Sequence, residues 1–215
     1  MLSLPEEMIL IALNHEKGAL YTTANWTLGA GLAGAMLTEL ALRNRLAISD
    51  NVLRALDSSA TGDPALDDVL NQIESREKPI KVSFWIQKLS MQGKKHGRLY
   101  LERLVESKIL KEEERLVLFF SSKRYFLRNK KLKRELFNRI RWVVLRRHEP
   151  DARLLCLLRL IQTCDWVRFI VEKDKVKEAK QRIKEWIEKN AAVEGAEQAQ
   201  AAAAILSSLT SVKVT

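Results

Sequence analysis

Apolar residues recur at helical spacing over most of the chain. After Asp63-Pro64, which caps and starts a helix, they lie three or four positions apart, at Leu66, Val69, Leu70 and Ile73. Near the N-terminus, Ser3-Leu4-Pro5-Glu6 is a capping box with proline in the first turn, and the helix that it opens, through Leu13, has almost no polar face. The pattern therefore predicts that this first helix is central in the fold.

The same spacing predicts seven further helices, one from residue 26 or 28 to 43 and the others over residues 82–91, 97–106, 129–147, 150–163, 166–189 and 191–209. Two β-hairpins interrupt them: residues 46–48 and 52–56 flank Asp50-Asn51, and residues 109–110 and 116–120 flank the charged turn 111–114. A helix followed by a hairpin is the layout of a winged helix. We expect a mainly α fold, a single globular helical domain over residues 1–215 with short β-hairpins, including a winged-helix-like segment at 97–120.

Charge is concentrated in one part of the chain. The net charge is +10, and the segment 123–147 alone carries eleven basic residues and one acid, Glu135, which also gives 11 − 1 = +10. An excess of this size favours polyanionic partners such as nucleic acid, anionic lipid or acidic protein segments. Since the apolar stripe of the helix at 129–147 leaves its bases on the solvated faces, we expect a contact surface, worth roughly 1 kcal/mol per Lys or Arg near an anionic membrane.

This basic surface comprises Lys123, Arg124, Arg128, Lys130, Lys131, Lys133 and Arg134. The alternative is an ordinary solvated helix whose bases pair with acids elsewhere, such as Glu112 to Glu114. A second, smaller cluster, Lys94, Lys95, His96 and Arg98, opens the helix of the winged-helix-like segment, where basic side chains and free N–H groups can bind an anion.

The sequence contains none of the motifs that would predict catalysis. The three histidines are far apart, no Cys/His spacing suggests a metal, and neither a P-loop nor a GxSxG motif occurs, so we expect no catalytic residues, metal or cofactor. Cys156 and Cys164 are expected to be buried thiols of a reduced, cytoplasmic protein. Residues 18–38 are uncharged, but their four glycines and four threonines favour a buried helix over a membrane span.

Several segments together are similar to a known family. They are Leu4-Pro5-Glu6-Glu7, the block from Gly31 to Leu46, Thr61-Gly62-Asp63 with Leu66-Asp67, Trp85-Ile86, and Leu104-Val105 leading into Ile109-Leu110. Over essentially its whole length the chain resembles the Golgi phosphoprotein 3 family, and its short N-terminus resembles bacterial members.

The resemblance implies a helical peripheral membrane protein on the cytosolic face of a membrane. Eukaryotic members bind phosphatidylinositol 4-phosphate at the Golgi and act as adaptors that retain glycosyltransferases, so cytoplasmic tails of membrane proteins are expected partners beside the anionic membrane surface. Carried over by position, the headgroup pocket comprises Trp26, Lys94 and Arg98. The pocket arginine of the family falls on Ala33, and its second later base falls on Gly97. The membrane-inserting hairpin of the family corresponds to Leu118, Phe119 and Phe120.

Two other classes of function compete with membrane binding. In a winged-helix nucleic-acid binder, the helix at 97–106 would enter the major groove and the hairpin at 115–120 would be the wing. Glu102, Glu106 and an acidic hairpin turn argue against nucleic acid as the partner. A protein-binding scaffold is not distinguished from a membrane adaptor by the sequence.

Overall fold

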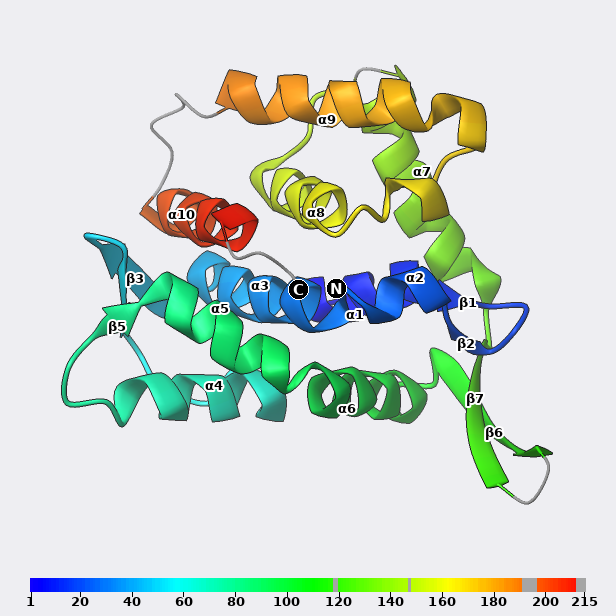
Figure 1. The fold of residues 1–215 in the computed structure, drawn as a ribbon, viewed down its shortest axis with the longest axis horizontal. Coiled ribbons are helices and arrows are strands. Elements are labelled where there is room, and N and C mark those ends of the chain that lie inside the picture. The colour runs from blue at the N-terminus through cyan, green and yellow to red at the C-terminus, as the bar shows by residue number, and fades with distance from the viewer. Residues whose placement is uncertain (118–119, 147, 191–196, 212–215) are drawn as a thin grey trace.

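The computed structural model describes residues 1–215 except 118–119, 147, 191–196 and 212–215 (Figure 1). Its α-helices are α1 (Leu4–Ala12), α2 (Thr22–Asn25), α3 (Leu28–Leu42), α4 (Pro64–Glu74), α5 (Val82–Met91), α6 (Gly93–Glu106), α7 (Lys130–Arg146), α8 (Ala152–Thr163), α9 (Val176–Asn190) and α10 (Glu197–Ser211). Its strands are β1 (Leu13–Asn14), β2 (Ala19–Leu20), β3 (Leu46–Ser49), β4 (Val52–Ala55), β5 (Ile80–Lys81), β6 (Leu110–Val117) and β7 (Phe120–Leu127). The mainly α class with short β-hairpins is confirmed.

Helix α1 begins at the predicted capping box and is central. The backbone N–H of Ser3 donates to Oε2 of Glu6 at 2.8 Å, and Pro5 lies in the first turn. All nine residues of α1 are buried. An apolar helix without a polar face has this position because burial removes its whole surface from water.

Helix α3 contacts helices on several sides and holds the core together. It packs against α1, α5, α6, α8 and α10, and in Figure 1 it lies between the group α4–α6 and the group α8–α10. A Cβ added to Gly31 would lie 2.9 Å from Sγ of Cys164, and one added to Gly34 would lie 2.8 Å from Cδ2 of Leu209. The predicted buried helix is correct only from Leu28 onward, where small residues allow close approach, because residues 19–20 and 22–25 form β2 and α2 and Trp26 is exposed. Among the residues described, no helix is both long and apolar enough to cross a bilayer.

The hairpin β3–β4 confirms the prediction made from Asp50-Asn51. These two residues have φ angles of +52° and +60°, as a two-residue turn between antiparallel strands requires, and β5 pairs with β4 on its other edge. Asp63 caps α4 as predicted, since its Oδ1 accepts from the backbone N–H of Ala65 at 3.1 Å.

Two predicted helix boundaries are wrong. The α-helix predicted over 166–189 covers only α9, because residues 167–169 and 173–175 form two 3₁₀ turns and Asp165, with φ of +59°, ends α8 sharply. Trp166, Val167, Ile170 and Val171 are all buried, and because their spacing also fits one face of an α-helix, the apolar pattern did not distinguish the 3₁₀ turns from a continuous helix. Helix α6 begins at Gly93 rather than at Gly97, so Lys94, Lys95 and His96 lie in its first turn.

The second hairpin exists, but its acidic residues lie elsewhere than predicted. Strand β6 runs through Glu112–Glu114, and the register pairs Glu113 with Arg124 and Glu114 with Lys123 on β7. The acids are therefore in a strand, opposite bases, and the strands continue until Val117 pairs with Phe120. This hairpin projects from the helical body (Figure 1).

Candidate functional site

The first turns of α3 and α6 touch through their glycines. A Cβ added to Gly93 would lie 2.4 Å from Cα of Gly29, and a Cβ added to Gly29 would lie 2.4 Å from the carbonyl oxygen of Ser90. Only residues without a side chain allow such backbone contact. The N-terminal ends of α3 and α6 and the C-terminal end of α5 therefore meet at one place, which we call the α3–α6 junction.

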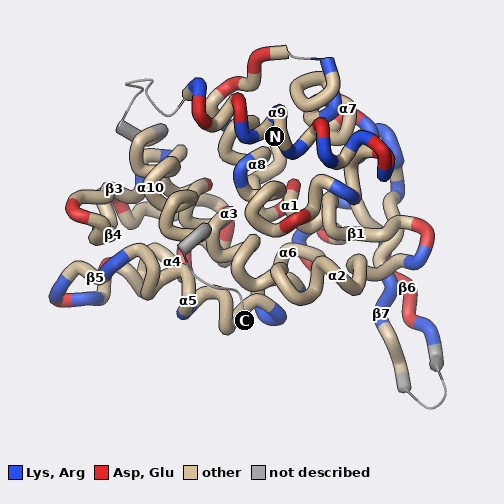
Figure 2. The backbone as a smooth tube through the Cα atoms, turned by 45° about the horizontal axis from the view of Figure 1, so that its top comes forward, with Lys and Arg blue, Asp and Glu red and all other residues tan. Residues whose placement is uncertain are grey.

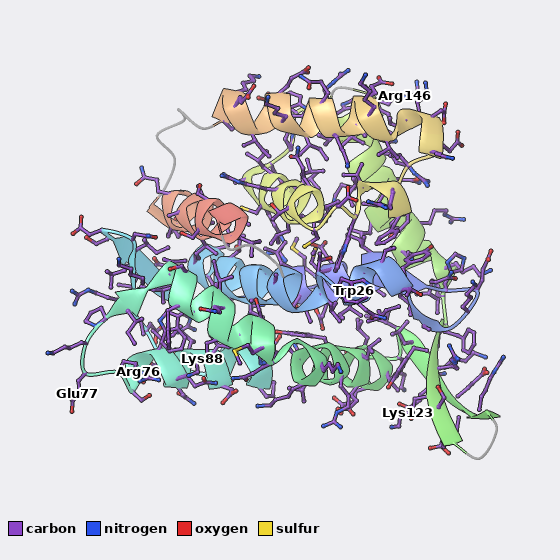
Figure 3. All side chains as sticks on the ribbon, in the orientation of Figure 1. Trp26, Arg76, Glu77, Lys88, Lys123 and Arg146 are labelled. Carbon is purple, nitrogen blue, oxygen red and sulfur yellow. The ribbon has the colours of Figure 1, made fainter. Side chains whose placement is uncertain are left out.

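Trp26 lies beside this junction with its side chain in solvent. It follows α2 directly, and it is 81% exposed (Figure 3). The next residue, Thr27, is fixed to the core, because its Oγ1 accepts from Nε1 of Trp166 at 2.8 Å and donates to the carbonyl of Cys164 at 3.3 Å. The backbone at Trp26 is thus held in place, while the indole has the freedom of a surface side chain.

Lys94 and Arg98 lie one turn apart on α6 and are both exposed. Arg98 makes a loose ion pair with Glu102, with its Nε 3.7 Å from Oε1. The two bases share a face of α6, so one anion could contact both.

The two remaining family pocket positions face inward. Gly97 is buried, and a Cβ on it would lie 3.2 Å from Cδ2 of Leu28. Ala33 has no exposed surface. An arginine at either position would point into the helix packing of this chain, so the arginine contact of the family pocket has no equivalent here.

The electrostatics of the junction depend mainly on its side chains. The N-terminal ends of α3 and α6 carry partial positive charge, but the C-terminal end of α5 offsets part of it. His96 is buried, neither ring nitrogen has a hydrogen-bond partner, and burial together with nearby Lys95 holds its pKa below the ordinary value. His96 is therefore neutral at physiological pH, and Lys94 and Arg98 supply the positive charge.

The basic surface lies mostly along α7 and is largely exposed. Arg128, Lys130, Lys131 and Arg134 are all in solvent, and Figure 2 shows the basic positions that follow α7. Lys131 faces Glu135 of the same helix at 3.8 Å, a weak pair at the surface. Lys130, Lys131 and Arg134 remain available to an anionic partner, whereas Nε of Arg128 donates to the carbonyl of Leu110 at 3.2 Å.

Lys133 does not belong to this surface, contrary to the prediction. Its side chain is 6% exposed, its Nζ donates to the carbonyl of Leu13 at 2.5 Å, and the same Nζ lies 5.0 Å from the ring centroid of Phe137. Burial lowers the pKa of Lys133 to about 8. Lys133 lies three residues before Leu136 and seven before Ile140, so it is on the buried face of α7.

On the β6–β7 hairpin, the alternative interpretation, that the bases pair with acids such as Glu112 to Glu114, is partly correct. Nζ of Lys123 lies 2.9 Å from Oε1 of Glu112, while Arg124 is opposite Glu113, whose carboxylate lies 2.7 Å from Nζ of Lys111. Lys123 is therefore less available to an external anion than the exposed bases of α7. Leu118 and Phe119 of the predicted inserting hairpin lie outside the described residues, and Phe120 is described only as the first residue of β7.

A buried ionic network was missed by sequence reasoning. Oε1 of Glu7 on α1 accepts from Arg139 of α7 at 2.5 Å, and Oε2 of Glu39 on α3 lies 2.9 Å from Nη2 of Arg153. Burial raises the pKa of Glu7, and the arginine only partly offsets this. The network joins α1, α3, α7 and α8, so Arg139 is structural. The acids on the otherwise apolar faces of α1 and α3 were the available signal.

A pocket of about 550 Å³ between α4 and α6 is a poor candidate for an anion. Its charged lining comprises four acids and two bases, Asp63, Asp68, Glu102, Glu106, Lys95 and Arg103. The bases face acids, since Nζ of Lys95 lies 3.6 Å from Oδ2 of Asp68. Within the described part of the chain, no group of three His, Cys, Asp or Glu side chains could hold a metal ion.

Comparison with known proteins identifies the family. The family model described as Golgi phosphoprotein 3 (GPP34) matches residues 4–205. Vacuolar protein sorting-associated protein 74 of Eremothecium gossypii is 32% identical over 100 residues. That match covers 41% of this chain and 30% of the relative, so the chain matches less than a third of that protein's length. Because the family model spans nearly all of the sequence, the chain belongs to the Golgi phosphoprotein 3 family.

Proposed function

We propose that this protein is a non-catalytic peripheral membrane protein that binds anionic lipid headgroups at the α3–α6 junction. The observation that carries the proposal is the exposed indole of Trp26 beside the exposed bases Lys94 and Arg98 at that junction. An indole is suited to the interface of a bilayer, where its ring contacts acyl chains and its N–H reaches polar groups. The two bases would bind a phosphate between them.

The exposed bases of α7 would add a second, less specific attraction. Lys130, Lys131 and Arg134 of α7, with Arg128 just before the helix, contribute to attraction toward an anionic surface, and this attraction fades within a Debye length of about 8 Å at physiological ionic strength. Membership of the family, and the sorting role in the printed name of the relative, support an adaptor that binds cytoplasmic tails of membrane proteins on the cytosolic face.

We expect Trp26→Ala and Lys94→Ala each to lower affinity for anionic vesicles several-fold without unfolding the protein. The matched controls are Leu56→Ala and Lys184→Ala, an exposed apolar residue just after β4 and an exposed lysine on α9. The measurement is co-sedimentation with phosphatidylserine vesicles, alongside melting curves. Unchanged binding of Trp26→Ala together with a melting temperature lower by many degrees would show that Trp26 is structural and would overturn this site.

We also expect little selectivity among headgroups. With Ala33 and Gly97 facing inward, the site lacks two charged hydrogen bonds, each of which can contribute about 1.5–3 kcal/mol. Preference for phosphatidylinositol 4-phosphate over phosphatidylserine, at matched vesicle charge, should therefore be below about tenfold. A strong phosphoinositide preference would show that another residue supplies the missing contact.

A further inference from the structure

Exposed apolar side chains gather near the α3–α6 junction. Among the described residues, six large apolar side chains are exposed, and three of them are Trp26, Phe84 and Met91. Met91 is 85% exposed and Phe84 is 41% exposed. Single exposed apolar residues are ordinary on a protein surface, whereas clusters of them mark interaction sites.

Phe84 and Met91 lie on one face of α5. They are seven residues apart, with Lys88 between them at helical spacing, while Trp85, Ile86 and Leu89 are buried on the opposite face. We call Phe84, Lys88 and Met91 the α5 stripe. Lys88 is labelled in Figure 3, and its Nζ lies 4.9 Å from the ring centroid of Trp85. The stripe therefore has apolar ends and a cation in the middle.

The α5 stripe continues into the proposed headgroup site. Met91 directly follows Ser90, whose carbonyl oxygen would lie 2.4 Å from a Cβ on Gly29, and Trp26 is three residues before Gly29. Met91 and Trp26 thus flank the same backbone contact. Lys94 follows Met91 by three residues, in the first turn of α6. The backbone contact therefore brings the segments that carry these apolar and basic side chains together.

The charge of this surface suits an anionic bilayer. Residues 82–101 contain four bases and no acid, and residues 18–38 contain no charged residue. Two of these bases face carboxylates outside the segment, since Lys95 lies 3.6 Å from Asp68 and Arg98 lies 3.7 Å from Glu102. Lys88 and Lys94 keep their positive charge, which attracts a negative interface. Two long apolar side chains thus face solvent near Lys88 and Lys94, an arrangement that suits the boundary between headgroups and acyl chains.

We propose that the α5 stripe enters the interfacial layer of an anionic bilayer, with Phe84 and Met91 inserted beside Trp26 and Lys88 at the level of the headgroups. This inference rests on the proposed membrane function. It adds to the headgroup site a second part of the surface, which contacts the apolar layer of the bilayer. A lysine between two inserting side chains can extend its amine to the phosphates while its methylenes stay in the apolar layer.

The first test replaces the apolar ends of the α5 stripe and leaves all charges in place. Met91→Ser and Phe84→Ser should each weaken partitioning onto vesicles of 30% phosphatidylserine and 70% phosphatidylcholine, by about ten-fold for Met91→Ser. Leu56→Ser is the matched control, because Leu56 is an exposed apolar residue just after β4. The Leu56→Ser protein should partition onto the vesicles as the wild type does. Equal partitioning of wild type, Met91→Ser and Phe84→Ser would overturn the inference.

The second test locates the surface directly. In vesicles that also contain phosphatidylserine, phosphatidylcholine with brominated acyl chains should quench part of the tryptophan fluorescence of the bound wild type and of Trp142→Phe, and this quenched part should decrease in Trp26→Phe. Any remainder would come from Trp85, whose ring lies 5.7 Å from that of Phe84. Quenching that is unchanged in Trp26→Phe but lost in Trp142→Phe would place the face of α7 at the bilayer and overturn the inference. If the wild type does not bind the vesicles at all, the proposed function fails as well. If it binds while the serine variants bind equally well, only the α5 stripe is excluded.

Discussion

At the scale of single residues, Lys133 shows how a base can be part of the core. Its amine is buried and hydrogen-bonded to one carbonyl, and its pKa is lowered to about 8 from an ordinary value of 10.5. Below pH 8 both the folded and the unfolded chain hold this proton. Between pH 8 and 10.5 the folded chain has released it while the unfolded chain retains it, so stability rises with pH in this window.

We therefore expect Lys133→Met to remove a pH dependence that the wild type has. From pH 7 to 10.5 the wild type should gain up to about 3 kcal/mol in free energy of unfolding relative to the variant. Urea unfolding of both proteins at several pH values measures this difference. Parallel pH profiles would show that Lys133 is charged and solvated in the folded protein.

Ala33 provides a second test at the residue scale. Because Ala33 is fully buried, Ala33→Arg should destabilise the fold by about 3–5 kcal/mol, which lowers the melting temperature by about 10 °C. Ala60→Arg, in an exposed loop, is the control and should melt like the wild type. A stable Ala33→Arg protein with sharpened phosphoinositide preference would mean that this position faces the lipid site.

At the scale of elements, the close contact between α3 and α6 depends on Gly29. Gly29→Ala should destabilise the protein by about 1–3 kcal/mol, because its Cβ would meet the backbone carbonyl of Ser90, which cannot move independently. Gly97→Ala is the matched control. Its Cβ would meet only the end of the Leu28 side chain, so the usual helical preference for alanine should leave stability equal or slightly higher. Equal melting temperatures of the two variants would contradict the contact.

The exposed bases of α7 allow the contribution of a whole helix face to membrane binding to be tested. Reversing Lys130, Lys131 and Arg134 together to glutamate should weaken binding to phosphatidylserine vesicles at least ten-fold at low salt. Lys133 is left unchanged because its reversal would disrupt the core. Reversal of the exposed lysines 173, 177 and 184 changes the net charge equally and is the control. Equal losses in both triple variants would mean that only net charge matters.

The elements that could be predicted from sequence are those fixed by neighbouring residues. The capping box at Ser3, the Asp63-Pro64 helix start and the Asp50-Asn51 turn depend on contacts within a few positions, and all three are present. The 3₁₀ turns before α9 and the pairing of Glu7 with Arg139 depend on packing between distant segments. For Lys133, the spacing to Leu136 and Ile140 was a local signal, but the surrounding bases obscured it.

At the scale of the whole molecule, one core supports all the surfaces that we propose for membrane binding. Buried apolar residues from α1 to α10 form a single cluster, and we propose that residues 1–215 are one domain. Exposed bases of α7, the α3–α6 junction and the α5 stripe would then move as one body onto a membrane. The candidate site could be only partly predicted, because Trp26 and Lys94 were suggested by resemblance, whereas the α5 stripe becomes apparent only when α3 and α5 are packed together.

The most direct test of membrane binding is titration of the wild-type protein with vesicles of increasing phosphatidylserine content, beside a titration with duplex DNA at the same salt. Our account predicts that vesicle binding increases steeply with phosphatidylserine, decreases as salt is raised, and exceeds binding to DNA at each salt concentration. The helix–hairpin layout of α6, β6 and β7 makes DNA the relevant competitor. Tighter binding to DNA, or no binding to vesicles at any phosphatidylserine content, would contradict the account.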